Sequence, residues 1–420
     1  MSKRLHILAL LLFAQVAFQN LLLGQPGEKD LLSYDYNGTG KPGASGPDFL
    51  KVMSHLETQK VLLDIAAEPK DPSSIEKELK GTGVTVGVLE ALRLIRRDGD
   101  RYVLAFSLLA NADLDRIRAV AEKEGNSLAA AFLARRSEIE NILARNPQPG
   151  VDGKARAFII LGCASLDWDG LNLIRKRGYL AVPRKEEYLP EAREIGGGGS
   201  LRGIYWGSHS YHEAIAVTSF GDHYSLPRNA LPDILSSLAS SLSQMDAPES
   251  LKNRLVGAAD ALIRRRAGMI MLALRESEKT LGQLALASNI TEVETKKILD
   301  LLLELNYVSV VDNHYQAIIP VLDESDSPMV KELRRLGQDV MVKWFDDHYT
   351  DLSQQLNNLT PVRYGMPLSE SFYSVWHYVF GIANRELVAA GLFANPYDNK
   401  RVFKGFVPTV YILSVLQGTI

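Results

Sequence analysis

The sequence predicts a soluble, mainly helical α+β protein made of two tandem copies of one pattern, with a β-hairpin inserted in the first copy. Three observations support this fold class. Apolar residues recur at the three-and-four spacing of amphipathic helices along most of the chain. An order of three helices, a polar turn and a strand occurs twice. Several residues of the first copy also recur 213 positions later in the second.

Composition limits the protein classes that fit this chain. Its 420 residues are enough for two or three domains with ordinary globular cores. The net charge of -3 gives no overall attraction to nucleic acid, so a nucleic-acid partner would need a local basic face. The single cysteine, Cys163, excludes an intrachain disulfide and a cysteine-based zinc cluster. It lies in an apolar run, residues 158–165, which we expect to form a buried strand and not a catalytic site.

The N-terminus has the order of an export signal. Lys3 and Arg4 precede an apolar run over residues 5–18, which is too short to span a bilayer comfortably. We therefore expect a leader over residues 1–24, an extracytoplasmic location, and no stable membrane span once the leader is removed. The alternative is a buried N-terminal helix in a cytoplasmic protein. Residues 25–48 are rich in Gly, Pro, Asn and Ser, which predicts a flexible linker.

The first copy occupies residues 49–195 and begins with helical periodicity. Pro69 and Pro72 end its first helix, and the turn Asp98-Gly99-Asp100 separates its last helix from a strand. The expected elements are a helix over residues 50–65, a helix over 75–79 capped by Ser73 or Ser74, a helix over 85–95, and a strand over 102–106.

The second copy occupies residues 236–420 and repeats this order. Its expected elements are a helix ending over residues 264–275, helices over 281–287 and 291–305, and strands over 306–311 and 315–320 around the turn Asp312-Asn313-His314. Four residue pairs share the separation of 213 positions: Tyr102 and Tyr315, Gly178 and Gly391, Ala181 and Ala394, and Pro183 and Pro396. A constant separation over about a hundred residues favours an internal duplication.

Each copy also contains a long charged helix and a helix that ends at glycine. The long helices are expected over residues 113–143 and 329–356, where they pair within one chain or between two chains of a homodimer. Gly178 and Gly391 fit the left-handed position after a helix C-terminus, and a proline follows each of them. Asp169 is the expected N-cap of the helix that ends at Gly178.

Residues 196–235 appear only in the first copy and contain the strongest metal candidates. After a flexible loop over 196–200, the apolar runs 203–208 and 214–220 predict a hairpin. His209, His212, Glu213, Asp222 and His223 lie within fifteen residues. A seven-residue strand spans roughly 23 Å, so the pairs at its two ends do not meet unless the chain folds back. We expect surface and core histidines here, with a divalent-metal site at His209, His212 and His223 as the alternative.

The order of three helices and a strand turn resembles that of winged helix-turn-helix proteins of the MarR and ArsR type. The resemblance covers about a sixth of the chain in each copy and rests on element order. It implies that the third helix of each copy would enter the DNA major groove. The third helix of the second copy carries Lys296 and Lys297 among four carboxylates, at Glu292, Glu294, Asp300 and Glu304. Carboxylates oppose binding to phosphates, so the sequence favours the fold over the DNA function.

Two further clusters have structural and functional interpretations. Arg264, Arg265 and Arg266 lie on the helix before the second copy, and we expect a solvated face there. If the protein binds DNA, these arginines join Lys296 and Lys297 as the contacts. The aromatic cluster Phe372, Tyr373, Trp376, His377, Tyr378 and Phe380 has helical spacing and is expected in the core, with an aromatic ligand pocket as the alternative.

Three functions follow from these patterns. The first is a non-catalytic extracytoplasmic binding or scaffold protein that uses winged-helix-like domains to contact a protein partner. The second is a cytoplasmic transcriptional regulator that binds DNA. The third is a metal-dependent hydrolase that uses the histidines near the hairpin. The sequence contains no P-loop, dinucleotide fingerprint or nucleophile elbow.

Overall fold

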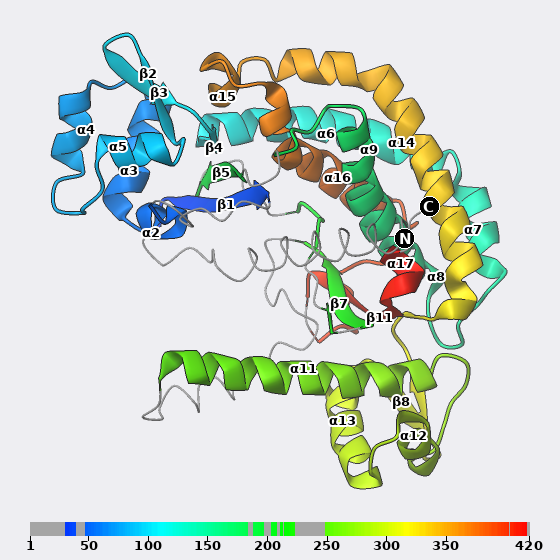
Figure 1. Cartoon of the computed structure of the whole chain (residues 1–420). Coiled ribbons are helices and arrows are strands. Elements are labelled where there is room, and N and C mark those ends of the chain that lie inside the picture. Colours follow the sequence, from blue (N-terminus) through cyan, green and yellow to red (C-terminus); the bar gives the residue numbers. More distant parts are fainter. Residues whose placement is uncertain are drawn as a thin grey trace, which may run out of the picture. The chain divides into compact units, whose positions relative to one another are not determined.

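The computed structural model describes residues 30–38, 47–183, 188–196, 203–207, 211, 212, 214–222, 248–402 and 404–417. It is an α+β protein in which helices predominate, as predicted (Figure 1). The chain forms two compact units, and each draws on both halves of the sequence, whereas the sequence predicts consecutive domains. Unit 1 comprises Met1–Ala121, Leu173–Ser200 and His348–Trp376, and unit 2 comprises Glu122–Asn172, Leu201–Asp347 and His377–Ile420.

Unit 1 contains a module of helices followed by a two-stranded hairpin. The predicted first helix is interrupted at Ser54 and His55, so it forms two helices. The predicted third helix is shorter than expected because the chain leaves it at Arg93, which has a left-handed φ of 57°. The elements are α2 (Phe49–Met53), α3 (Leu56–Ala67), α4 (Pro72–Glu78), α5 (Val86–Ala91), β2 (Ile95–Asp98) and β3 (Arg101–Leu104).

Side-chain caps define the short helices of this module. Asp71 accepts a hydrogen bond from the Ser74 amide and caps α4, so the expected caps Ser73 and Ser74 are incorrect. Thr85 accepts from the Val88 amide and caps α5. An isolated antiparallel bridge joins Lys70, between α3 and α4, to Tyr102 of β3. The hairpin is thereby tied to the start of the module.

A three-stranded sheet completes unit 1. Strand β1 (Leu32–Gly38) pairs antiparallel with β5 (Tyr188–Glu194), and β4 (Ser107–Leu109) pairs parallel with the other edge of β5. Residues 32–38 were expected in a flexible linker, because their composition is polar. Their alternation, LSYDYNG, instead suits a strand paired along its whole length.

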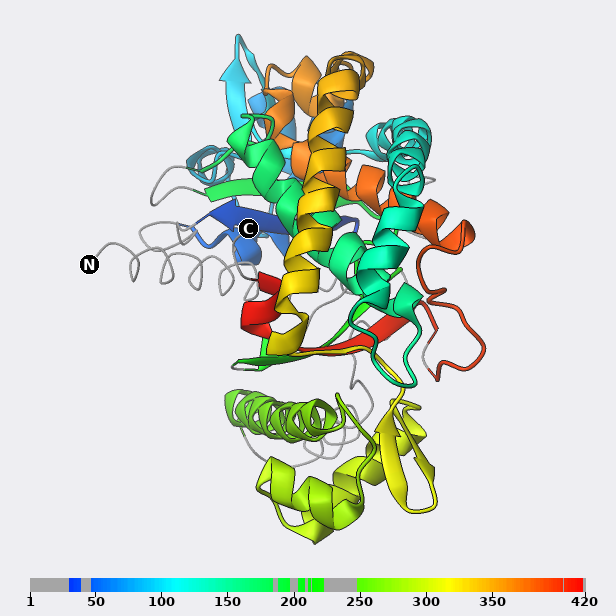
Figure 2. The ribbon, with the colours of Figure 1, turned by 90° about the vertical axis from the view of Figure 1, so that its right-hand side faces the viewer.

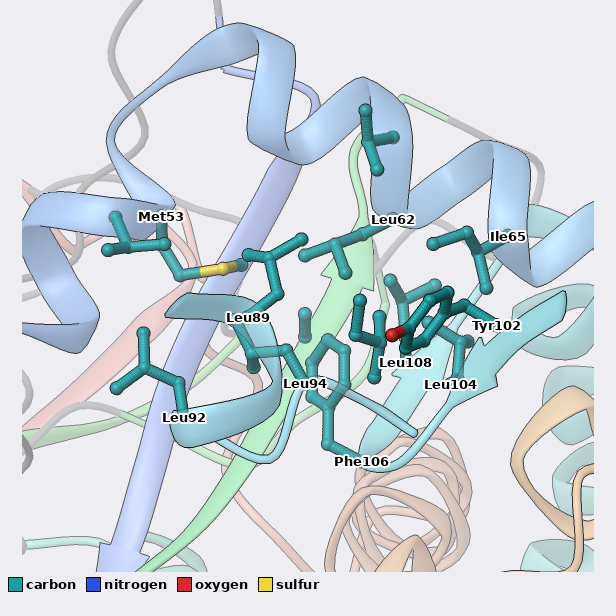
Figure 3. Packing of buried hydrophobic residues seen from close by; sticks show 14 of the residues in the cluster. Met53, Leu62, Ile65, Leu89, Leu92, Leu94, Tyr102, Leu104, Phe106 and Leu108 are labelled. Atoms are coloured by element: carbon teal, nitrogen blue, oxygen red, sulfur yellow. The ribbon is translucent and has the colours of Figure 1, made fainter. Parts of the chain in front are cut away.

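The apolar core of unit 1 lies between the module and this sheet. Figure 3 shows Leu62 and Ile65 of α3 facing Leu89 of α5 and Leu104 of β3. All four side chains are fully buried. The short helices are individually weak, so their packing on this core determines their stability.

Unit 2 contains a second module with the same order of elements. Its elements are α11 (Glu249–Ala273), α12 (Leu281–Ser288), α13 (Glu292–Glu304), β8 (Val308–Val311) and β9 (His314–Ala317). Both α12 and α13 pack against α11, and the β8–β9 hairpin stands beside them (Figures 1 and 2). An isolated bridge joins Lys279, just before α12, to Tyr315 of β9.

The sheet of unit 2 corrects the predicted hairpin insertion. Its strand order is β10 (Val321–Leu322), β11 (Phe406–Ile412), β7 (Ile215–Gly221) and β6 (Tyr211–His212). Strand β7 pairs with β11 along its full length, so it is a central strand of this sheet. The expected partner run is described over residues 203–207, where Tyr205 forms an isolated bridge to Asp222 and the Gly207 amide donates to the Gly221 carbonyl at 2.9 Å. The short β6 takes the hairpin position instead.

Long helices connect these parts of the chain. The first predicted long helix breaks at Ala134 and Arg135 into α6 (Asn111–Leu133) and α7 (Arg136–Ala144), whereas the second is continuous as α14 (Ser327–Gln355). Gly178 and Gly391 have φ values of 74° and 72° and end their helices as predicted. The remaining helices are α8 (Gly153–Ala157), η1 (Phe158–Asp169), α9 (Gly170–Lys176), η2 (Glu324–Asp326), α15 (Thr360–Arg363), η3 (Leu368–Glu370), α16 (Phe372–Ala389) and α17 (Leu413–Gln417).

The run around Cys163 is helical, so the predicted strand is wrong. It forms η1, a π-helix whose residues are buried on nearly every side, and such a run has no periodicity that separates a helix from a strand. Burial raises the pKa of the Cys163 thiol well above its ordinary value. Within the described residues, Gly153–Lys176 is the one helical stretch long and apolar enough to cross a membrane. Of its most apolar window, 83% is buried inside the protein, as in a core helix.

A buried charge cluster holds several segments of unit 2 together. The Asp326 carboxylate is fully buried at the N-terminus of α14. Its Oδ1 accepts from Arg275 Nη2 at 2.8 Å, from Arg156 Nη2 at 3.2 Å and from Asn146 Nδ2 at 2.9 Å. Its Oδ2 accepts from Arg275 Nε and from the Asp323 amide, both at 3.1 Å. Burial lowers the pKa of Arg156, and the neighbouring Asp326 opposes that effect.

Asp326→Ala is expected to lower the free energy of unfolding by about 3–5 kcal/mol, because it leaves two buried arginines without their counter-charge. Asp339→Ala, on an exposed position of the same helix, is the matched control and is expected to change it by less than about 0.5 kcal/mol. Urea denaturation measures both. Equal, small effects of the two variants would contradict the role of Asp326 as the counter-charge of the two buried arginines.

Unit 1 contains a carboxyl group, Glu191, whose surroundings disfavour its charged form. Glu191, in the central strand β5, accepts a hydrogen bond from the Ser374 hydroxyl of α16. Its cross-strand neighbour Ser107 shares a buried hydroxyl contact of 2.9 Å with Ser371. Burial raises the pKa of Glu191, although Arg193 and the Ser374 hydrogen bond lower it in part. The folded protein therefore favours the protonated form of this group.

A raised pKa makes the contribution of Glu191 to stability greatest below the unfolded-state pKa, and that contribution is lost as the pH rises through the folded-state value. Glu191→Gln resembles the protonated form and is expected to raise the melting temperature relative to wild type by an amount that grows from pH 4 to pH 7. Thermal unfolding at several pH values measures this difference. A constant or shrinking difference would contradict the burial of a raised-pKa carboxyl.

Candidate interaction surface on the second module

The turn between α12 and α13 has a well-defined local structure. Thr280 and Gln283 form a capping box at the start of α12. Helix α12 ends at Asn289, which has a left-handed φ of 53°. Thr291 then caps α13 by accepting from the Glu294 amide at 3.2 Å. Both helices are thus fixed at the ends that face this turn.

A groove of about 520 Å³ lies at this turn. Apolar side chains and carboxylates meet in it, and Arg266 of α11 lies at its edge, where Nη1 is 3.0 Å from the Glu294 carboxylate. The lining residues are Arg266, Ala285, Leu286, Asn289, Ile290, Thr291, Glu292 and Glu294.

Large apolar side chains are exposed around the groove. Leu286 at the end of α12 is 85% exposed, and Val293 in the first turn of α13 is 67% exposed. On the hairpin, Val310 and Val311 are also exposed. Isolated exposed apolar residues are ordinary, but Leu286 and Val293 lie on the same turn, which makes this turn a candidate contact surface.

The charged side chains of α13 are mostly acidic. Lys296 forms an ion pair with Asp300 one turn later, and this hydrogen bond raises the pKa of the lysine amine. Lys297 is exposed. Residues 274–317 together contain seven Asp and Glu against four Lys and Arg. One of those cations, Arg275, is buried against Asp326, so this part of the module exposes more carboxylates than cations, whereas α11 adds five Lys and Arg against two Asp and Glu.

The arginine triplet is only partly on the surface. Arg264 is 1% exposed, and its guanidinium donates to Asp260 at 2.6 Å and to the Val217 carbonyl at 3.3 Å. Burial lowers its pKa, and Asp260 opposes that effect. Arg266 pairs with Glu294, and Arg265 is exposed. Of the five residues expected to contact DNA, Arg265, Lys296 and Lys297 are exposed to solvent, whereas Arg264 serves the interior of unit 2.

The expected metal ligands fall largely outside the described residues. His209, Glu213 and His223 lie there, and the backbone of His212 belongs to β6. The neighbouring Asp222 is 1% exposed, and its Oδ2 accepts from Tyr397 at 2.5 Å and from the Gly203 amide at 3.2 Å. In the part of the chain that the structure describes, no three His, Cys, Asp or Glu residues gather in a way that would hold a metal ion.

Two other predicted features have clear positions. The aromatic cluster on α16 is buried as expected at Phe372, Trp376, His377, Tyr378 and Phe380, whereas Tyr373 is 38% exposed. Asp169 was expected to cap the helix that ends at Gly178, but it lies within a continuous helical run. Its carboxylate instead pairs with Arg334 of α14, with the Nε donor 2.9 Å away.

The apolar part of this surface was not predicted from the sequence. A signal was present at Leu286, because Leu281 and Leu284 are one turn apart and Leu286 is out of phase with them. The corresponding module of unit 1 is different. None of the large exposed apolar side chains among the described residues lies within 56–106. The two modules therefore share an order of elements but present different surfaces.

Comparison with known proteins gives no relative for this chain: no family model, no curated protein and no solved structure matches it.

Leu286→Asp is expected to change the free energy of unfolding by less than about 0.5 kcal/mol, because its side chain already lies in water. Leu284→Asp, two residues earlier and fully buried, is expected to cost about 4 kcal/mol or more. Denaturation curves of both variants compare the two positions. A large loss for Leu286→Asp would show that this leucine belongs to the core and not to a contact surface.

Proposed function

We propose that the chain is a non-catalytic binding or scaffold protein, and that a face of its second module binds a protein partner. In this proposal both modules are winged helices. Helices α3, α4 and α5 of the first module correspond to α11, α12 and α13 of the second, and a two-stranded hairpin follows each set. In each module a residue before the second of these helices forms a bridge with the hairpin, through Lys70 and Tyr102 or through Lys279 and Tyr315. This third short pairing is typical of winged-helix order.

Equivalent hydrogen bonds at the 213-residue separation support a duplication of the whole pattern. In the first copy the Ala110 amide donates to Asp113 Oδ2 at 3.1 Å, and in the second the Asp323 amide donates to Asp326 Oδ2 at the same distance. The two glycine caps also match, because the Tyr179 amide donates to the Ile174 carbonyl and the Leu392 amide to the Leu387 carbonyl. Such repeated detail is difficult to obtain from unrelated segments.

The sheets support the same interpretation. In unit 1 the strand after the hairpin, β4, runs parallel to β5, and β1 runs antiparallel to β5 on the other side. In unit 2 the strand after the hairpin, β10, runs parallel to β11, and β7 runs antiparallel to β11. Each unit thus places the strand before its module, the strand after its hairpin and its last strand in the same order, although β1 and β7 lie outside the 213-residue separation.

The surface of the second module favours a protein partner over DNA. In a DNA-binding winged helix, the start of the third helix and the hairpin approach phosphates. Here those two positions present Val293, Val310 and Val311, with Glu292 and Glu294 beside them. Desolvated apolar groups contribute to protein interfaces, whereas carboxylates near phosphates weaken DNA binding.

A protein-binding face would serve an exported protein and a cytoplasmic one alike. The expected leader, residues 1–24, lies outside the described residues. The proposed partner site lies on the second module and does not depend on the compartment of the protein.

A photo-crosslinking residue at position 286, in the full chain expressed in its native cells, is expected to give a discrete protein adduct. The same residue at position 262, which is exposed on α11, is the control and is expected to give none. Fluorescence polarisation with duplex DNA at low salt provides the opposing test. No adduct at position 286 would contradict the protein-binding face. Salt-dependent DNA binding that is lost in Lys296→Glu/Lys297→Glu would favour the DNA regulator instead.

A further inference from the structure

The β2–β3 hairpin of the first module carries three arginines whose charge is not balanced by an ion pair. The Arg96 guanidinium donates to the Tyr364 carbonyl at 2.6 Å, Arg97 to the Gly99 carbonyl at 3.0 Å, and Arg101 to the Pro69 carbonyl at 3.4 Å. All three are exposed, and none forms an ion pair with any residue that the structure describes. We call these residues the arginine hairpin.

A guanidinium has five donors in a planar fork, so one backbone carbonyl leaves most of its binding capacity unused. Its preferred partner is a carboxylate, which accepts two of these hydrogen bonds at once. Its aliphatic stem also covers apolar surface while the charged end stays hydrated or paired. An arginine hairpin therefore suits a partner surface that combines carboxylates with exposed apolar side chains.

The groove of the second module has this combination. Leu286 and Val293 are exposed beside the carboxylates of Glu292 and Glu294. Glu294 forms an ion pair with Arg266, but Glu292 is exposed and forms no ion pair with a described residue. The hairpin also carries the exposed carboxylates Asp98 and Asp100, so its net charge is +1.

We propose that the occupant of this groove is the arginine hairpin of a second copy of the chain. Each chain carries both surfaces. Two reciprocal contacts give a closed two-fold dimer, whereas contacts that do not close extend into longer assemblies. The contact rests on the proposed function, because it names the protein partner of the same face. Its attraction is electrostatic, and it falls with salt as charges that interact over about 10 Å at 0.1 M become screened within about 3 Å at 1 M.

The test is sedimentation of the full chain at low and high salt, with charge-reversal variants. Wild type is expected to dimerise at low salt and to dissociate at high salt. Arg96→Glu/Arg97→Glu/Arg101→Glu and Glu292→Arg/Glu294→Arg are each expected to weaken the dimer by at least about tenfold. Arg97→Glu/Arg101→Glu and Glu292→Arg alone are milder versions that keep the Arg96 and Glu294 contacts. Lys77→Glu/Lys80→Glu, at exposed positions on α4 and just after it, is the control with no expected effect.

Mixing the two full reversal variants is expected to restore a salt-sensitive heterodimer, because each reversed surface then meets its opposite charge. A monomeric wild type at low salt, a dimer that ignores salt, or a mixture that stays monomeric would each overturn the proposal. A crosslink from position 286 to a different protein, in a chain that stays monomeric, would overturn this partner while keeping the protein-binding function. A chain that stays monomeric and gives no crosslink from position 286 would contradict the protein-binding function as well.

Discussion

The buried carboxylate of Asp326 is the interaction on which unit 2 most depends. It receives hydrogen bonds from Arg275 just after α11, Arg156 of α8 and Asn146 after α7, and it also accepts from the Asp323 amide in the capping box of η2. Two cations and one anion, all buried, are costly unless their geometry is maintained. The helices that carry these groups therefore hold a fixed register, and the second module is joined at Arg275 to a rigid base. The groove between α12 and α13 is presented from that base.

Helix periodicity and capping residues predicted much of the local structure. The helices of the second module, the glycine caps at Gly178 and Gly391 and the aromatic core on α16 follow from patterns that act within a few residues. Tertiary pairing decided the rest. The polar run of β1 forms a strand because β5 lies beside it. The apolar run of η1 is buried on nearly every side, so its sequence has no periodicity that separates a helix from a strand. Neither neighbour can be read from the local sequence.

The candidate surface was harder to predict than the fold. The sequence places Lys296, Lys297 and the arginine triplet near each other, but it does not reveal that Arg264 is directed into the protein or that Lys296 is paired with Asp300. The apolar part of the groove depends on which side of α12 faces α11, and this is decided by Leu284 and not by Leu286. The two modules share an order of elements, yet among the described residues only the second exposes large apolar side chains.

The composition of unit 1 from three separate segments has a consequence for synthesis on the ribosome. Its last segment, His348–Trp376, belongs to the second half of the sequence. The first module emerges early, but the residues that complete its unit are translated only after the whole second module. Nascent unit 1 must therefore wait, with part of its core uncovered, for a segment made many seconds later at about 5–20 residues per second. Shielding by a chaperone during this interval would matter more for this chain than for one whose domains are consecutive.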